Sequence, residues 1–395
     1  KAIKCFDKVL QIDPSNSELV NNLATSFRFI KNDSIIKNHL YLKKLFLFIF
    51  KNKNTNHKFI TKDISVFLFE ARNFNQIINI LKSKTLLLQN KIIQDLLKEE
   101  LFHLVLQKSL IPNILYEKLL TQLRYQILFT LNDTNKDILD EHFNFIISLA
   151  EQCWLNEFIY AQSEKEINQI IKLKNKIEND NSINEIEIAI LGCYMPLNKS
   201  KTIIEKLFNY KSTNILFNDL INVQIKEPLK EKELAKSIKS LNEIVDSVSK
   251  KVQNQYEENP YPRWRLTNQI IPRNFFFFLN YEIKPNKINY NNKFNNPNVL
   301  IAGCGTGSHP IQATKYQNAN ILAVDLSKSS LAYAKRKTEE LGLKNIEYLH
   351  ADILQLKKLD KKFDIIEASG VLHHMKNPMA GLKVLVDILE PQGFL

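Results

Sequence analysis

The last quarter of the chain alternates short apolar runs with segments of helical periodicity. A run that is apolar on consecutive residues is typical of a strand that is covered on both faces of a sheet. Residues 326–341 place apolar side chains at helical spacing, and Ser327 is the expected N-cap. Strands and helices in alternation predict a parallel, right-handed α/β sheet. The predicted strands are residues 298–302, 321–325, 346–350 and 363–368, with a further strand beginning at residue 394.

The ends of these predicted strands carry residues suited to binding. Ligands of parallel sheets bind beyond the carboxyl ends of the strands. The first strand leads into a turn with Gly303, Gly305 and Gly307, where the missing Cβ atoms permit a sharp turn and close approach of a bound molecule. The helix that follows directs unpaired N–H groups at the same place. The next two strands end at Asp325 and Asp352, so the pattern predicts a nucleotide-type site.

The middle of the chain has a different periodicity. From residue 36 to residue 235 the apolar spacing is mostly three to four, which predicts an all-helical domain without a chemical motif. Gly192 is the only glycine before the glycine-rich turn, and so few glycines suit helices better than tight-turned β structure. Ser163 and Glu166 form a predicted capping box. We assign residues 155–159 to the helix that precedes it.

Three segments connect the helical domain to the predicted sheet. Residues 230–251 are charged with one apolar stripe, which predicts a connecting helix. Residues 256–264 contain two prolines flanking Tyr261, which end the helix and impose an extended path. We expect this segment to fold over the glycine-rich turn as a lid; the alternative is a linker packed on the outside of the domain. Residues 275–278 are four phenylalanines that we expect to be buried against the sheet.

The beginning of the chain matches a repeat pattern. Ala2, Phe6 and Pro14 have the spacing of the second helix of a tetratricopeptide repeat, and Ala24 is a small residue where a further repeat packs two helices closely. This predicts the last part of a tetratricopeptide array, with an ordinary helical hairpin as the alternative. Because the chain begins inside this helix and ends as a strand begins, we expect a fragment at both ends.

Composition excludes several classes of protein. The net charge of the 395 residues is +12, but nearly all of the basic charge is lysine, which accompanies abundant Asn and Ile. We therefore expect no nucleic-acid partner, although one remains an alternative through lysine. The four cysteines form no C-x-x-C pair, so we expect no metal site and no disulfide scaffold. This cysteine usage suits a reducing compartment, and we expect a cytoplasmic protein. No apolar run reaches membrane-spanning length.

Four motifs together resemble one enzyme family. Residues 300–307 (LIAGCGTG), 324–325 (VD), 350–353 (HADI) and 370–375 (GVLHHM) occur in the order and at the spacing of a class I S-adenosylmethionine-dependent methyltransferase. The dinucleotide-binding fingerprint fits less well, because Ser308 stands where its last glycine belongs. The chain also departs from the methyltransferase pattern, which commonly has an acid two residues before the first glycine, where this chain has Ile301.

The resemblance implies roles for individual residues. Asp325 would accept hydrogen bonds from both ribose hydroxyls, and Asp352 from the adenine amino group, with Ile353 packed on the ring. Cys304 is expected to pack rather than react. His373 and His374 are the catalytic candidates, because a histidine can accept a proton near neutral pH; the alternative is that they only shape the floor of the site. The implied cofactor-binding set is Gly303, Cys304, Gly305, Gly307, Asp325, Leu326, Asp352, Ile353, Glu367, Tyr256 and Tyr261.

The resemblance extends over most of the chain. Residues 252–264, with residues 150–157, resemble segments of bacterial proteins that join tetratricopeptide repeats to a methyltransferase. The expected fold is a Rossmann-like α/β methyltransferase domain, incomplete at its C-terminus, preceded by an all-α, tetratricopeptide-like region. The expected parts are residues 1–35 (repeat remnant), 36–235 (helical domain), 236–297 (connecting helix and lid) and 298–395 (methyltransferase domain).

Two functions remain open from the sequence. The first is methyl transfer from S-adenosylmethionine to a small-molecule or protein acceptor, with the helical repeats recognising a protein or peptide partner through their concave surface. The second is a non-catalytic scaffold whose nucleotide-binding fold is degenerate, an idea that the missing acid at Ile301 supports.

Overall fold

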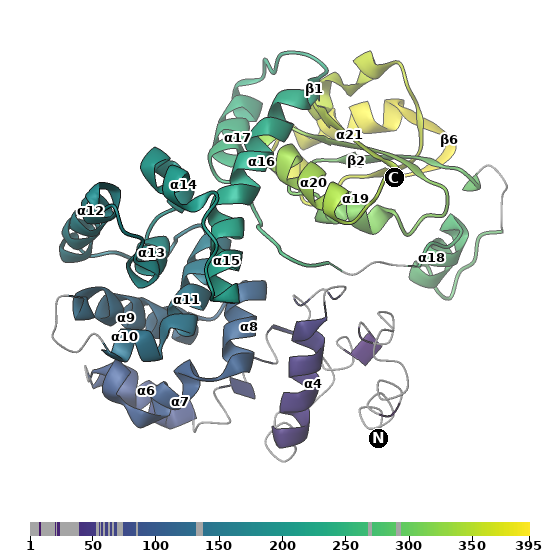
Figure 1. The fold of residues 1–395 in the computed structure, drawn as a ribbon. Coiled ribbons are helices and arrows are strands. Elements are labelled where there is room, and N and C mark those ends of the chain that lie inside the picture. Colours follow the sequence, from purple (N-terminus) through teal and green to yellow (C-terminus); the bar gives the residue numbers. More distant parts are fainter. Residues whose placement is uncertain are drawn as a thin grey trace. The chain divides into compact units, whose positions relative to one another are not determined.

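The computed structural model divides into two compact units, each described here by itself (Figure 1). Unit 1 comprises Lys1–Leu229 with Trp264–Asn268, and unit 2 comprises Lys230–Arg263 with Gln269–Leu395. The predicted repeat remnant, residues 1–35, lies outside the described residues except at four positions. The described residues are 8, 20, 22–23, 39–52, 55, 57, 60–61, 64, 67–68, 74–83, 86–131, 137–267, 271–289 and 294–395.

Every described element of unit 1 is helical. Helix α11 lies at its centre, because all of residues 145–155 are buried, and it packs against α8, α13 and α15. The predicted all-helical region is therefore present in the described residues. The α-helices are α4 (His39–Lys51), α6 (Phe74–Lys82), α7 (Lys91–Leu97), α8 (Glu100–Lys108), α9 (Ile114–Thr130), α10 (Asp137–Glu141), α11 (Phe143–Leu155), α12 (Glu164–Asn179), α13 (Glu185–Gly192), α14 (Lys201–Leu207) and α15 (Ile215–Ile221).

The local sequence predicts the start of α12 in unit 1 correctly, but it predicts the end of α11 wrongly. The predicted capping box is present: the Ser163 Oγ accepts from the Glu166 N–H, and the Glu166 carboxylate accepts from the Ser163 N–H. The assignment of residues 155–159 to the preceding helix was wrong, because α11 ends at Leu155. Glu157 and Phe158 both have a φ of 57°, in the left-handed region, which a continuing α-helix excludes.

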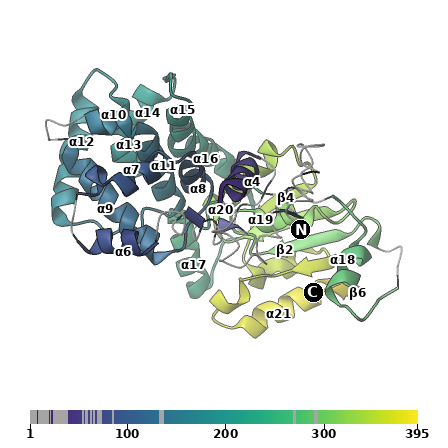
Figure 2. The same ribbon diagram turned by 90° about the horizontal axis from the view of Figure 1, so that it is seen from below.

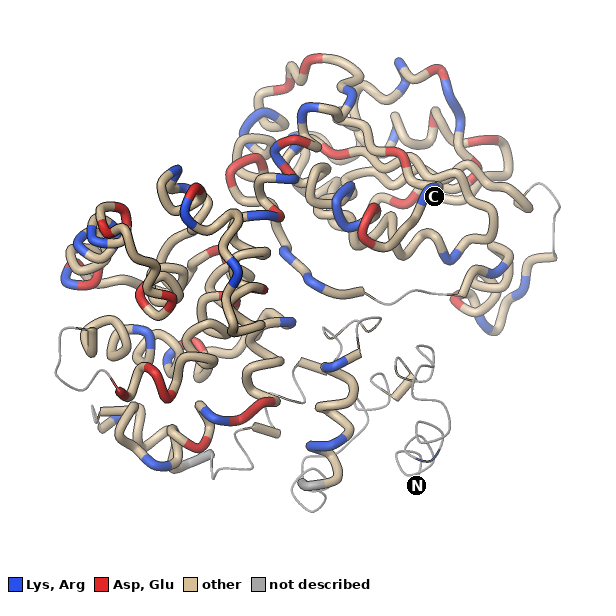
Figure 3. Tube along the Cα trace, viewed as in Figure 1, with Lys and Arg blue, Asp and Glu red and all other residues tan. Residues whose placement is uncertain are grey.

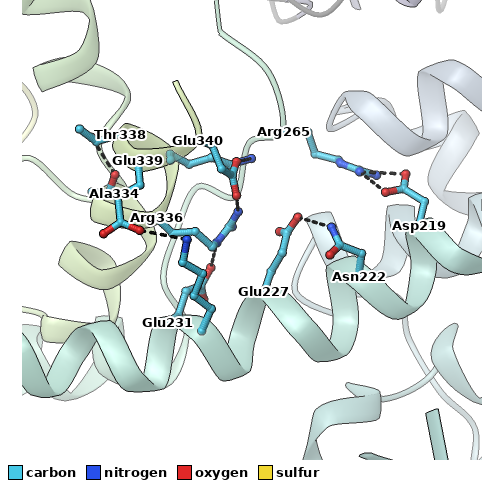
Figure 4. A network of polar contacts seen from close by, with 12 residues as sticks. Asp219, Asn222, Glu227, Glu231, Arg265, Ala334, Arg336, Thr338, Glu339 and Glu340 are labelled. Atoms are coloured by element: carbon cyan, nitrogen blue, oxygen red, sulfur yellow. Dashed lines mark hydrogen bonds and ion pairs between the residues drawn. The ribbon is translucent and has the colours of Figure 1, made fainter. Parts of the chain in front are cut away.

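An ion cluster around the buried Glu151 in unit 1 holds the short segment that contains Arg265. Arg265 donates to the Oε2 of Glu151 at 2.6 Å. It also donates to both carboxylate oxygens of Asp219, at 2.8 and 2.9 Å (Figure 4). The Glu151 side chain is fully buried, on α11. Burial raises the pKa of Glu151 well above its ordinary value, although Arg265 opposes the rise.

Unit 2 contains a six-stranded, fully parallel sheet with the order β1-β4-β3-β2-β5-β6. The predicted parallel α/β sheet is therefore confirmed. Figure 2 shows α20 and α21 on opposite sides of the strands. The strands are β1 (Lys239–Ser240), β2 (Asn298–Ala302), β3 (Asn320–Asp325), β4 (Ile346–His350), β5 (Phe363–Glu367) and β6 (Leu389–Phe394), and the helices are α16 (Glu227–Ser237), α17 (Ser247–Glu258), α18 (Phe275–Glu282), α19 (Ser308–Ala313), α20 (Lys328–Glu340) and α21 (Pro378–Asp387).

The start of unit 2 differs from the predicted connecting helix over residues 230–251. Helix α16 ends at Ser237, β1 follows, and α17 begins at Ser247. Strand β1 pairs with β4, with Ser240 opposite His350. Arg336 of α20 joins α16 to the sheet layer, because its buried guanidinium bonds Glu231 at 2.8 Å and Glu340 at 2.5 Å (Figure 4).

The four phenylalanines at residues 275–278 form the first turn of α18 and only partly fulfil the expected burial. Phe275 and Phe276 are buried, whereas Phe277 is 62% exposed. The Phe275 ring lies 4.9 Å from the Phe394 ring of β6, which attaches α18 to that side of the sheet.

Basic and acidic residues are interspersed along the chain rather than gathered in one segment, as Figure 3 shows. In the part of the chain that the structure describes, no helix is long and apolar enough to cross a membrane.

Candidate functional site

The glycine-rich turn leaves β2 at the carboxyl edge of the sheet. The N–H groups of Gly303 and Cys304 both donate to the Val324 carbonyl of β3, at 2.9 and 3.0 Å. Gly303, Gly305 and Gly307 have φ values of 71°, 52° and 89°, which side chains rarely adopt. The turn is thus fixed to the neighbouring strand and needs glycine at all three positions for backbone reasons.

The space around the three glycines separates their roles. A Cβ on Gly303 would lie 2.4 Å from the Cγ2 of Val371, and one on Gly307 would lie 2.4 Å from the Cβ of Ala334. Around Gly305 the nearest atom is the Tyr261 carbonyl oxygen, at 3.9 Å. The lack of a side chain at Gly303 and Gly307 therefore makes room for other residues of the protein, whereas Gly305 borders open space. This opening suits a ligand that approaches the backbone closely.

Asp325 closes the next strand and bridges two backbone segments. Its Oδ2 accepts from the Gly305 N–H at 2.8 Å, and its Oδ1 accepts from the Ser327 N–H at 2.9 Å. Burial raises the pKa of the Asp325 carboxyl, and these N–H groups oppose the rise. Each carboxylate oxygen has a second lone pair, so the group can still accept from a ligand's hydroxyls. Leu326, which follows, offers its carbonyl to the Nε2 of His350 at 2.9 Å.

Asp352 lies at the same edge of the sheet, after β4. The two strand ends are joined directly, because the Ala351 N–H donates to the Asp325 carbonyl at 3.0 Å. The Oδ1 of Asp352 accepts from the Leu354 N–H at 2.9 Å, which caps the 3₁₀ segment Ile353–Leu359. Asp352 is 3% exposed and Ile353 is 6% exposed, so little of either residue reaches the surface.

Glu367 ends β5 and is held by two side chains that the sequence did not indicate. It accepts from the Tyr316 hydroxyl at 2.5 Å and from the Nε2 of His309, on α19. Burial would raise the pKa of Glu367, but these hydrogen bonds bring it below its ordinary value. Glu367 pairs in register with Ile301, so a carboxylate lies one strand away from the position of the absent acid.

Residues 256–263, called the covering segment below, reach the glycine-rich turn and the start of α20. The Pro262 carbonyl accepts from the Thr306 hydroxyl at 2.7 Å, and the Tyr256 carbonyl accepts from the Ser327 hydroxyl at 2.9 Å. Tyr261 is 48% exposed. These bonds attach the segment to the glycine-rich turn and to the start of α20, while its role as a lid stays a prediction.

His373 and His374 lie on the loop after β5, in the short 3₁₀ turn Leu372–His374. Their ring centroids are 4.0 Å apart, and the His374 ring is 6.4 Å from the Tyr256 ring. The structure therefore brings one catalytic candidate beside the covering segment. Cys304 is buried, and burial raises the pKa of its thiol well above the ordinary value, which suits packing and not nucleophilic attack.

Sequence reasoning missed four residues of this site: Glu257, Thr306, His309 and Tyr316. Thr306 stands inside the glycine-rich motif and could have been included for that reason. The other three act through hydrogen bonds to distant segments, for which a single sequence gives no signal. Among the described residues, no three of the His, Cys, Asp and Glu side chains gather as a metal site.

Comparison with known proteins concerns the same part of the chain. The family model described as "Methyltransferase domain" matches residues 299–393. A probable (S)-tetrahydroprotoberberine N-methyltransferase of Papaver bracteatum is 38% identical over 88 residues, which are 22% of this chain and 24% of that protein. The ubiquinone biosynthesis O-methyltransferase of Rickettsia bellii is 28% identical over 151 residues, which are 38% of this chain and 61% of that protein.

A solved S-adenosylmethionine-dependent methyltransferase from Clostridium acetobutylicum is 29% identical, with a TM-score of 0.22, over 25% of this chain and 40% of that one. The chain spans only 24%, 24% and 14% of the length of the first three curated relatives that it matches. The matches locate a methyltransferase domain at residues 299–393.

Proposed function

We propose that this chain is an S-adenosylmethionine-dependent methyltransferase that uses the domain at residues 299–393 to methylate a small-molecule acceptor. The observation that carries the proposal is the opening at Gly305, where the nearest atom to an added Cβ is 3.9 Å away. The Asp325 carboxylate lies at the rim of this opening, bonded to the Gly305 N–H.

The proposed site residues come from the ends of four neighbouring strands, β2 to β5. Gly305 admits the cofactor against the backbone, Asp325 accepts from the ribose hydroxyls, and Asp352 accepts from the adenine amino group. Glu367 supplies a carboxylate one strand away from Ile301. When bound, the cofactor supplies an electrophilic methyl group on a sulfonium centre. The remaining members of the implied set, such as Leu326 and Ile353, stay predictions from the sequence.

The chain's own contribution to chemistry is alignment and proton acceptance. Orientation alone can supply much of a transfer rate. His374 is the better placed of the two candidates, because its ring lies near Tyr256 of the covering segment. We propose that it accepts the proton that the acceptor releases, and that His373, whose ring lies 4.0 Å away, shapes the floor of the site.

A small-molecule acceptor is favoured by the names of the relatives, a probable (S)-tetrahydroprotoberberine N-methyltransferase and a ubiquinone biosynthesis O-methyltransferase. A protein or peptide partner bound by tetratricopeptide repeats stays a prediction, because residues 1–35 lie outside the described residues apart from four positions. The four-part domain division and the cytoplasmic location also stay predictions.

Calorimetric titration tests the proposal against the non-catalytic scaffold. We expect the protein to bind S-adenosylmethionine and S-adenosylhomocysteine, and not NAD. Binding of none of the three would favour the scaffold with a degenerate fold.

Asp325→Asn tests the ribose assignment. The amide has one acceptor oxygen, so it loses one of two charge-assisted bonds to the backbone and offers a weaker partner to the ribose hydroxyls. We expect S-adenosylhomocysteine affinity to fall by about 10- to 100-fold, since such bonds contribute about 1.5–3 kcal/mol. Asp360→Asn is the control, because Asp360 is exposed and its φ of 47° suits Asn. Unchanged affinity in Asp325→Asn would show the assignment to be wrong.

A further inference from the structure

The C-terminal end of α17 is bound to the N-terminal end of α20 through one carboxylate. Glu257 accepts from the Lys328 N–H at 2.6 Å, the Ser329 N–H at 2.9 Å and the Ser329 hydroxyl at 2.6 Å. Figure 1 shows the two helices side by side. The first N–H groups of a helix lack partners within it, and its N-terminus attracts negative charge, so a carboxylate is well suited to this position.

This contact adds to a cap that α20 already has. The Ser327 hydroxyl accepts from the Ser330 N–H at 3.0 Å, which is the ordinary N-cap bond, and it also donates to the Tyr256 carbonyl. Glu257 therefore satisfies the two N–H groups that Ser327 leaves. Two neighbouring residues thus hold the start of α20, Glu257 by three side-chain hydrogen bonds and Tyr256 by one bond to its carbonyl.

The position of this attachment links it to the proposed site. Helix α20 begins three residues after Asp325, whose carboxylate bonds the Gly305 N–H. The covering segment runs from Tyr256, beside His374, to Pro262, which bonds Thr306 in the glycine-rich turn. Glu257 stands at the point where helix α17 gives way to this segment.

We infer that Glu257 is a positioning residue, which fastens the covering segment over the glycine-rich turn and thereby retains the cofactor; this rests on the proposed function. The hydrogen-bond partners of Glu257 are Lys328 and Ser329, which are not residues of the proposed cofactor site. Glu257 acts through the start of α20 and through Tyr256, the residue before it. Loss of its carboxylate removes the side-chain link between the covering segment and the start of α20, while the Tyr256 and Pro262 carbonyl bonds remain.

The test compares Glu257→Ala with Glu258→Ala, which removes the same charge from the adjacent, exposed position. We expect Glu257→Ala to weaken S-adenosylhomocysteine binding by about tenfold, chiefly through faster dissociation, and Glu258→Ala to bind like the wild type. Glu257→Gln keeps an acceptor oxygen without the charge, so its affinity should lie between the two.

Limited trypsin digestion supplies a readout that does not depend on methyl transfer. Without ligand, cleavage after Arg263 should be faster in Glu257→Ala than in the wild type and in Glu258→Ala, with the fragment identified by mass spectrometry. Should Glu257→Ala fail to fold, Ser329→Ala removes one of the three bonds and is expected to give a smaller effect in the same direction.

The two proposals fail in different ways. Wild-type protein that does not bind S-adenosylhomocysteine would overturn the proposed function. Wild-type binding together with unchanged affinity and unchanged cleavage in Glu257→Ala would overturn this inference alone.

Discussion

The three glycines of the turn after β2 all have positive φ angles, but different neighbours occupy the space beside each of them. Gly303 and Gly307 leave room for Val371 and Ala334, so a side chain at either position would meet the protein itself. At Gly305 the chain leaves room for something that is not protein. The motif alone indicates where the backbone turns, whereas the identity of each neighbour depends on residues far along the chain.

Alanine at Gly303 should therefore lower stability, whereas alanine at Gly305 should lower cofactor affinity. Gly303→Ala places a Cβ 2.4 Å from Val371, so we expect a lower melting temperature. Gly305→Ala strains only the backbone, by about 1–2 kcal/mol, but fills the opening and should reduce S-adenosylhomocysteine affinity strongly. Gly342→Ala is the matched control, because Gly342 has a φ of 68° and nothing within 4 Å of an added Cβ. Equal affinity in Gly305→Ala and Gly342→Ala would contradict the proposed opening.

The element scale shows where sequence patterns are sufficient. The four predicted strands agree with β2 to β5 within one residue, and β2 and β3 are apolar runs that the sheet buries. Strand β1 was missed, since Lys239 and Ser240 are polar and the strand has no periodicity of its own. Its conformation comes from pairing with β4, which lies more than a hundred residues later. The partners of Glu367 escaped notice for the same reason.

Arg265 offers a test of how firmly unit 1 holds its own segment. Arg265→Met leaves the buried Glu151 without its cation, and breaking such a pair costs about 3–5 kcal/mol. We expect a loss of about 3 kcal/mol in the unfolding free energy, measured by urea denaturation. Lys201→Met, which breaks the exposed pair with Glu205, should cost less than about 1 kcal/mol.

The pH dependence of this variant has a definite sign. A carboxyl whose pKa is raised in the folded state contributes stability that is present at low pH and lost as the pH rises through the folded pKa. The cost of Arg265→Met should thus be smaller near about pH 5.5 than near about pH 8. A cost independent of pH, or one that Glu151→Gln fails to reduce in the double variant, would contradict this account.

At the scale of the whole molecule, the two compact units should unfold as separable steps. S-adenosylhomocysteine at about a hundred times its dissociation constant adds about 2.7 kcal/mol to the part that binds it. Differential scanning calorimetry should therefore show one transition that rises with ligand and another that does not, and Arg265→Met should lower the second. If ligand raised both transitions equally, binding would not be confined to unit 2.

Strand β1 has a practical consequence for anyone who shortens the gene. A recombinant piece cut at residue 298, just before the family match, would lack Ser240 and Leu241, which bond the His350 ring at 3.0 Å and the His350 carbonyl at 2.9 Å. Strand β4 would then be an unpaired edge strand, and an unpaired edge can pair with strands of other molecules. We expect such a piece to aggregate. Its inactivity would then result from the exposed strand edge and not from the loss of a catalytic group.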